Sequence, residues 1–104
     1  MEANIIFTTV PNKEVGDQIA NYLVKHKLAA CVNILPTVTS IYKWKGKVQK
    51  EEELLLMIKS IKQLNVASFE AIKNIHPYDT PEIITVEIND GDPAYLNWIS
   101  TIIE

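Results

Sequence analysis

The residues best suited to chemistry lie in the stretch NIHPYDTPEII, residues 74–84. It places His76 and Tyr78 among two prolines, shortly before Glu82. Pro77 disfavours the α conformation at His76, so a helix is expected to end there. The negative end of that helix dipole favours a cation, either a proton on the imidazole or a bound metal. Three roles stay open for His76: a structural cap on its helix, a ligand, or an acid–base group.

Other candidate ligands lie earlier in the chain. Cys31 begins an extended run, where it is expected either to pack as a small hydrophobe or to act as a soft ligand for copper. Glu51 and Glu53 would share one face of a strand, with Glu52 on the other. These acids are expected to be solvated strand charges or to line a cleft that takes a hard cation or a charged metabolite. The candidate metal ligands are His76, Cys31, Glu53 and Glu82.

Aromatic side chains and one lysine extend this polar set. The same alternation places Lys59 on the face of Glu51 and Glu53. Tyr42 and Trp44 near a hairpin tip can stack on a ligand or pack in an interface between subunits. The candidate residues for a cleft between subunits are therefore Tyr42, Trp44, Glu51, Lys59 and Tyr78. No nucleophile–base pair is recognisable, so no catalytic residue is assigned and no enzyme is expected.

Composition narrows the class of protein. The net charge of −3 argues against a nucleic-acid partner, and three glycines are too few for a glycine-rich phosphate loop. The single cysteine excludes an internal disulfide and fits a reducing cytoplasm. The longest apolar run is too short to cross a bilayer, and the acidic start does not resemble an export signal. We expect a cytoplasmic protein without a membrane partner.

The elements that must position these residues follow in the order β-α-β-β-α-β, with one added helix. β-branched and aromatic residues predict the strands, and apolar residues spaced by three and four predict the helices. Asn12 and Asp92 are expected helix caps, and Pro36 is expected to mark a bulge or an edge. The predicted strands cover residues 4–10, 31–44, 48–59 and 82–88. The second predicted helix has an apolar face made of Ile61, Leu64, Ser68, Phe69, Ile72 and Ile75. The inner face of the third predicted helix is made of Leu96, Ile99, Ile102 and Ile103.

This order predicts a single α+β domain, residues 1–104, with the ferredoxin-like split βαβ arrangement. Two helices would cover one face of an antiparallel sheet, with the first and third strands central. The central hairpin strands would span roughly 40 Å, whereas the covering helices span only ~21 Å. Half of the hairpin would therefore overhang its own domain. It either associates with other copies of the chain or bends back on its own sheet.

The order and spacing of several motifs resemble the CutA divalent-cation tolerance family. They are LAACVNILPTVTSIYKWKGKVQKEEELLLMIKS, HPYDTPEI and DPAYLNWI. The resemblance covers nearly the whole chain. It implies a homotrimer in which long hairpins pair between subunits, and a cytoplasmic role in tolerance to copper and other heavy metals. No cofactor is required, although copper or another divalent cation is a possible ligand.

The resemblance also suggests an alternative function, and the sequence differs from some family members at two positions. The architecture is similar to that of the PII signalling trimers, so a PII-like module that takes a small metabolite or an anion between subunits is the alternative. Some bacterial members carry a cysteine and a second histidine where this sequence has Thr8 and Ile75. A copper site of that kind would lack its thiolate and one imidazole here, so it is not carried over.

Overall fold

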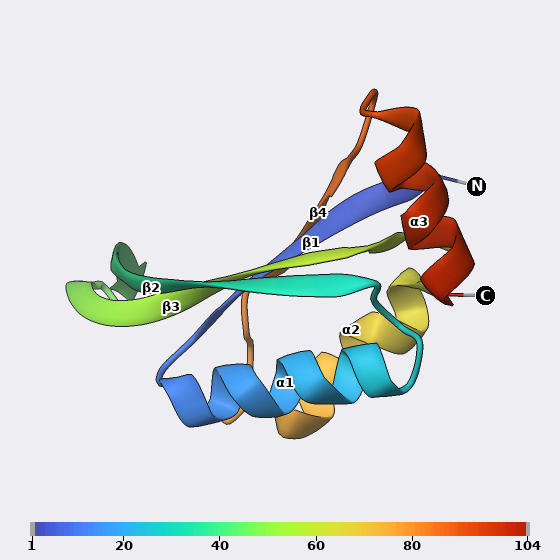
Figure 1. The fold of residues 1–104 in the computed structure, drawn as a ribbon. Coiled ribbons are helices and arrows are strands. Elements are labelled where there is room, and N and C mark those ends of the chain that lie inside the picture. The colour runs from blue at the N-terminus through green and yellow to red at the C-terminus, as the bar shows by residue number, and fades with distance from the viewer. Residues whose placement is uncertain (1, 104) are drawn as a thin grey trace.

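The computed structural model describes residues 2–103, which form one four-stranded antiparallel sheet and three α-helices (Figure 1). Within these residues no helix has the length and apolar character to cross a membrane. The predicted α+β class and the predicted order of elements are confirmed. The elements are β1 Ala3–Val10, α1 Lys13–Lys25, β2 Cys31–Trp44, β3 Lys47–Ile61, a 3₁₀ turn Lys62–Leu64, α2 Asn65–Ile75, β4 Ile83–Glu87 and α3 Pro93–Ile103.

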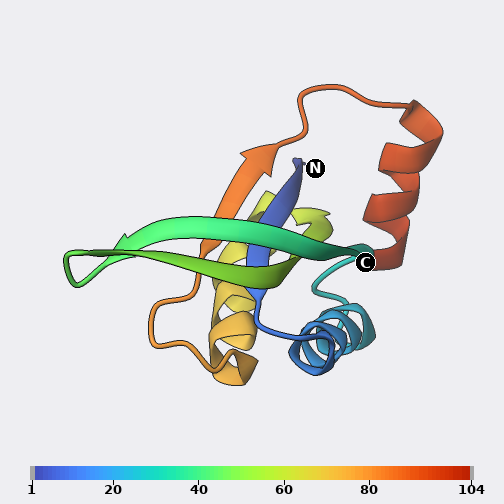
Figure 2. The same ribbon diagram turned by 90° about the vertical axis from the view of Figure 1, so that its left-hand side faces the viewer.

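The sheet has the strand order β2-β3-β1-β4, so β1 and β3 are central, as expected. Both α1 and α2 lie under one face of this sheet (Figures 1 and 2). Alternate residues of the central strands point to these helices, and each large aliphatic side chain buried there stabilises the fold by about 1.5–3 kcal/mol. The fully buried residues of this core include Ile6, Val10, Ile19, Leu23, Leu56, Ile58 and Ile72.

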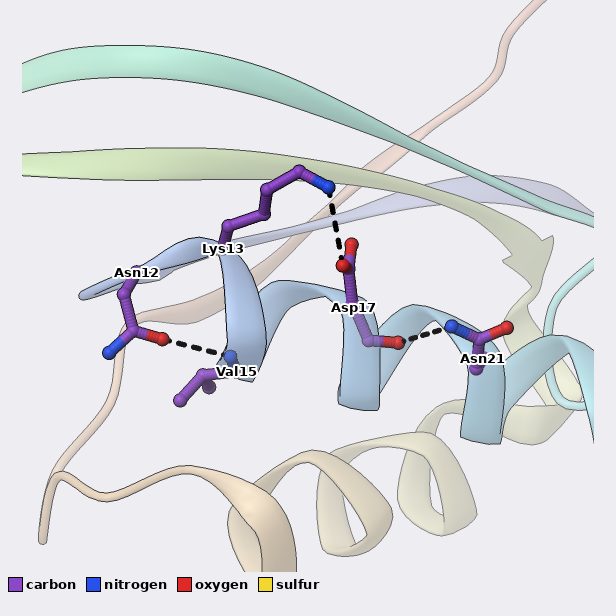
Figure 3. A network of polar contacts seen from close by, with 5 residues as sticks. All are labelled: Asn12, Lys13, Val15, Asp17 and Asn21. Atoms are coloured by element: carbon purple, nitrogen blue, oxygen red, sulfur yellow. Dashed lines mark hydrogen bonds and ion pairs between the residues drawn. The ribbon is translucent and has the colours of Figure 1, made fainter.

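The start of α1 is fixed by a side-chain cap. The side-chain oxygen of Asn12 accepts a hydrogen bond from the Val15 backbone N–H at 2.9 Å (Figure 3). This bond satisfies one of the backbone donors that a helix leaves free at its first turn. Further along the helix, Asn21 donates from its side chain to the Asp17 carbonyl at 2.8 Å. The predicted cap at Asn12 is confirmed.

The third helix lies at the end of the sheet opposite the hairpin tip (Figure 1). Asp92 caps it by accepting a hydrogen bond from the Tyr95 backbone N–H at 3.1 Å, as expected. Ile99 and Ile103 are buried against Ala30. Ile102, expected on the inner face, is 39% exposed because the buried stripe follows the four-residue spacing of Ile99 and Ile103 and leaves Ile102 beside it.

The boundary between β3 and the second helix differs from the sequence expectation. Ile61 was expected on the apolar face of that helix, but it is the last residue of β3 and pairs with Ala3 of β1. Helical periodicity could not detect this pairing, because the partner strand lies at the other end of the sequence. The helix itself begins after a 3₁₀ turn and ends before His76, whose backbone is extended as expected.

The β2–β3 hairpin extends beyond the rest of the fold (Figure 1). Lys45 and Gly46 form its two-residue turn with φ of 51° and 79°, the left-handed pair that matches the twist of a hairpin. β1 pairs with β3 only as far as Leu54, so the residues of β3 nearer the turn pair with β2 alone. Ile41 and Val48 are 68% and 73% exposed. The predicted overhang is confirmed, and the hairpin does not fold back on its own sheet.

A bulge in β2 decides which face its outer residues occupy. The register shifts by one residue between Leu35 and Val38, around Pro36, as the sequence predicted. Before the bulge Leu35 pairs with Leu55, and after it Val38 pairs with Glu53. Since a one-residue slip moves every later side chain to the opposite face, the bulge places Tyr42 on the face of the acids of β3.

The cap of α1 gives a test of how much local helix chemistry stabilises the fold. We expect Asn12→Ala to lower the free energy of unfolding by about 1 kcal/mol, because the Val15 N–H then loses its protein partner. Asn21→Ala removes an amide of the same size from an exposed position within the same helix and should cost less. Urea unfolding followed by circular dichroism compares the two variants. Equal losses would contradict a special role for the Asn12 cap.

Candidate functional site

A cleft of about 710 Å³ lies between the overhanging half of the hairpin and the loop that follows α2. We call it the hairpin cleft. The main side chains of its hairpin wall are Tyr42, Trp44, Glu51 and Glu53, and those of its loop wall are Tyr78, Asp79, Thr80 and Glu82. Thr9, near the end of β1, lines it as well.

The two walls are joined by one hydrogen bond. The Tyr78 hydroxyl donates to Oε2 of Glu53 at 3.0 Å, across 25 positions of sequence. Glu53 is only 6% exposed, so its carboxylate depends on this donor for part of the solvation that it loses. Burial, followed by the hydrogen bond to Glu53, raises the pKa of Tyr78 to about 12. Tyr78 therefore stays a hydrogen-bond donor throughout the physiological pH range.

A second phenol–carboxylate pair lies nearer the hairpin tip. The Tyr42 hydroxyl donates to Oε1 of Glu51. This hydrogen bond is the main reason that the pKa of Tyr42 is raised from its ordinary value. Glu52 lies on the other face, where it accepts a hydrogen bond from Thr39 at 3.3 Å. The predicted alternation of the three glutamates is confirmed.

His76 is buried beneath the loop wall, with an exposure of 6%. Its Nδ1 accepts a hydrogen bond from the Tyr78 backbone N–H at 3.2 Å, so its Nε2 donates to the Thr9 carbonyl at 2.7 Å. The proton is assigned to Nε2 from these partners. Both ring nitrogens are thus engaged, and neither presents a free lone pair. The side chain ties the loop to β1 rather than capping the carbonyls of its own helix.

Two predicted residues lie far from the cleft. Cys31 pairs with Lys59 across the sheet, six positions along β3 from Glu53, a separation of ~20 Å. Lys59 donates to the side chain of Asn33 there. Lys59 shares the face of Glu51 but lies too far along the strand to line the hairpin cleft, and its place in a cleft between subunits stays a prediction.

The other predicted cleft residues come together, whereas the predicted metal ligands do not. Tyr42, Trp44, Glu51 and Tyr78 all line the cleft. Across residues 2–103, no three His, Cys, Asp or Glu side chains are grouped so that they could hold a metal ion. His76, Cys31, Glu53 and Glu82 thus form no metal centre within one chain.

Sequence reasoning missed some cleft residues. Ser40 pairs with Glu51, and the bulge at Pro36 together with strand alternation would have placed it there. Thr80 lies between Pro77 and Pro81. The stiffness that these prolines give to the loop could have indicated Thr80 as a cleft residue. The carbonyl of Thr9 as the partner of His76 carries no sequence signal, since 67 positions separate the two residues.

The bond between Tyr78 and Glu53 predicts a stability difference that depends on pH. Tyr78→Phe should lower the free energy of unfolding by about 1 kcal/mol near neutral pH, because Glu53 loses a donor. The folded pKa of Tyr78 is raised from 10.0 to about 12. Its contribution is therefore fully present below pH 10.0 and is lost as the pH rises through about 12.

The measurement is urea unfolding of the wild type and Tyr78→Phe at about pH 8 and about pH 11.5. Tyr42→Phe is the matched control, since its bond to Glu51 lies in an exposed part of the hairpin. It should change the stability less. A difference between wild type and Tyr78→Phe that stays constant over this pH range would show that the hydroxyl does not supply the effect.

Comparison with known proteins gives a consistent family assignment. The model of the family described as CutA1 divalent ion tolerance protein matches residues 4–102. Divalent-cation tolerance protein CutA from Thermus thermophilus is 44% identical over 95 residues, which cover 91% of this chain and 92% of that protein. The crystal structure of CutA from Xylella fastidiosa is 38% identical, with a TM-score of 0.97 and 100% of both chains covered.

The animal relatives are longer than this chain. Protein CutA from Mus musculus is 43% identical over 98 residues, which cover 94% of this chain but 55% of that protein. The chain thus spans about half the length of this relative and nearly the full length of the Thermus thermophilus protein. Because the family model covers almost every described residue, the chain belongs to the CutA1 family of divalent ion tolerance proteins.

Proposed function

We propose that this protein acts in tolerance to divalent metal ions as a cytoplasmic homotrimer that binds the metal weakly. The match of residues 4–102 to the divalent ion tolerance family is the observation that carries this proposal. The proposed cytoplasmic location rests on the single cysteine, which has no partner in the chain for an internal disulfide. The strand order and the pair of helices on one face support the ferredoxin-like arrangement.

The need for a partner is supported by the sheet face that α1 and α2 leave open. Phe7, Met57 and Leu55 point to this face, by alternation with the buried residues of the same strands. On the neighbouring strand Ile84 and Val86 are 54% and 52% exposed. A continuous apolar surface of this kind is typical of an interface between proteins. The number of subunits, three, follows from the family resemblance.

The hairpin supports the same assembly. Its outer part leaves Ile41, Trp44 and Val48 more than half exposed, at 68%, 55% and 73%. A long pair of strands with large apolar side chains invites association with another chain. In the proposed trimer the hairpins and the open faces of the sheets are covered by neighbouring subunits.

Weak metal binding fits the donors that one chain offers. Carboxylates line the hairpin cleft, but no group of three ligands converges within residues 2–103, and the nitrogens of His76 are already bonded. In this proposal metal is a weakly held ligand of the protein. Copper is expected to bind more tightly than zinc, and magnesium least, by the usual order of affinities.

The PII-like alternative gains no support from the relatives named above, whose names refer to CutA and to divalent cations. A growth assay tests the proposed function. Expression of this protein in a bacterial strain that lacks its own CutA should improve growth under copper stress. Growth identical to that of the empty-vector strain over a copper gradient would contradict the proposed tolerance function.

Assembly is tested by placing a charge in the proposed interface. Trp44→Asp and Ile84→Asp should each shift the protein from a trimer towards single chains of 11.8 kDa, because a buried carboxylate without a partner is costly. Val66→Asp is the control, since Val66 is a 72% exposed residue on α2, away from the open face. Multi-angle light scattering gives the masses. A wild-type mass near 11.8 kDa at micromolar concentration would rule out the trimer.

The role of His76 is tested by comparing the two histidines. His76→Ala should lower the free energy of unfolding by about 2 kcal/mol, since it removes two hydrogen bonds of a buried ring. It should leave the copper isotherm nearly unchanged. His26→Ala removes the exposed imidazole of α1 and should reduce copper binding with little loss of stability. Titration calorimetry in which His76→Ala abolishes copper binding, while the variant stays folded, would make His76 a ligand after all.

A further inference from the structure

The loop between β4 and α3 contains an aspartate followed directly by a glycine, Asp90 and Gly91. No other glycine of the sequence follows an aspartate or an asparagine. In such a pair the backbone nitrogen of the second residue can attack the side-chain carboxyl carbon of the first and close a five-membered ring. Glycine favours this reaction, because it has no side chain beside the nitrogen and its backbone adopts many conformations.

The structure holds the two reacting groups together. The Gly91 backbone N–H donates to Oδ1 of Asp90 at 2.9 Å, so the nitrogen lies beside the carboxyl group whose carbon it would attack. Both residues are exposed, and residues 88–92 belong to no helix or strand. Such a backbone is free to turn as ring closure requires. The loop lies far from the hairpin tip (Figure 1), outside the hairpin and the open sheet face that the proposed trimer covers.

The three other aspartates of the chain lack one of these conditions. Asp92 precedes Pro93, whose nitrogen has no hydrogen to lose. Asp79 precedes Thr80, whose branched side chain crowds the backbone nitrogen. Asp17 lies within α1, where the regular helical backbone cannot turn towards the side chain. These aspartates are therefore internal controls for a reaction at Asp90.

We propose that Asp90 is a site of spontaneous isoaspartate formation, which loosens the first turn of α3. The Gly91 nitrogen loses its proton and bonds to Cγ of Asp90, while one oxygen of the neutral carboxyl group leaves as water and a succinimide ring forms. Water then opens the ring. Cleavage between the nitrogen and Cγ restores aspartate, whereas cleavage between the nitrogen and the main-chain carbonyl carbon of Asp90 leaves the chain running through the side chain. Water is the only molecule released or consumed.

The product lengthens the main chain by one methylene group just before α3. The loop is fixed at both ends, because the Ile88 backbone N–H donates to the Ala3 carbonyl at 3.0 Å and Asp92 caps α3 through the Tyr95 N–H. Only residues 89–91 lie between these anchors, so the added length displaces the cap. The first turn of α3 should therefore open more often and exchange its backbone amides faster, while the sheet is unchanged.

The test is incubation of the assembled protein at neutral pH and physiological temperature, followed by peptide mapping. Aspartate and isoaspartate peptides have the same mass, but chromatography separates them and electron-transfer fragmentation distinguishes them. We expect isoaspartate at Asp90, together with a succinimide form lighter by one water, and neither product at Asp17, Asp79 or Asp92. The folded protein should convert at least as fast as the free peptide INDGDPAY, residues 88–95, because the structure holds the nitrogen against the carboxyl group.

Two variants identify the reacting groups. Asp90→Glu keeps the charge but requires a larger ring, so it should abolish the product. Gly91→Ala should slow the conversion several-fold. This variant should stay folded, because the φ of Gly91 lies outside the left-handed region and an added Cβ would make an ordinary contact with Leu96 at 3.5 Å.

Three results would overturn the proposal. They are slower conversion in the folded protein than in the free peptide, equal rates in the wild type and Gly91→Ala, and unchanged amide exchange at the first turn of α3 in the purified isoaspartate form. The modification goes beyond the proposed metal tolerance and requires no metal. A chain that does not convert leaves the proposed function in place.

Discussion

The point at which β1 stops pairing with β3 determines most of what is distinctive in this chain. Val10 pairs with Leu54, and Pro11 then ends the strand. From Leu55 to Lys59, β3 pairs with β1 on one side and β2 on the other, but from Lys47 to Glu53 it pairs with β2 alone. Backbone pairing therefore continues along the hairpin after the sheet and its covering helices have ended. The overhang, its exposed apolar side chains and the space beside it all follow from this difference in length.

The loop after α2 occupies the gap that β1 leaves. His76 bonds to the carbonyl of Thr9, near the end of β1, and Tyr78 bonds to Glu53, the first residue of β3 beyond it. The two bonds hold the loop against both strands at the place where their pairing ends. Because the imidazole of His76 also accepts from the Tyr78 backbone, the orientation of Tyr78 depends on His76. His76 is thus a positioning residue of the cleft in this structure.

Much of this arrangement could be predicted from local sequence. The cap at Asn12, the bulge at Pro36 and the end of α2 before Pro77 are all set by the chemistry of one or two residues. The errors concern residues whose position depends on a distant segment. Ile61 fits a helical period, yet it pairs with Ala3, and Lys59 has the face of Glu51 but lies away from the hairpin cleft along its strand. Periodicity reports the direction of a side chain, not which segment lies opposite it.

Glu51, Glu52 and Glu53 are consecutive residues of the same type, yet each lies in a different environment. Glu52 points away from the cleft, where its carboxylate is solvated and accepts a hydrogen bond from Thr39. Glu51 points into the cleft beside Tyr42, which the bulge in β2 has brought to the same face. Glu53 has the same direction as Glu51 but lies where the loop closes over the strand, so it is buried and bonded to Tyr78. Strand alternation places Glu52 on the opposite face from its two neighbours. Glu53 differs from Glu51 in burial, because Glu53 lies next to the end of β1, where the loop covers it. A run of three acids that looks uniform in sequence therefore supplies one solvated charge, one accessible acceptor and one buried carboxylate that holds the two walls of the cleft together.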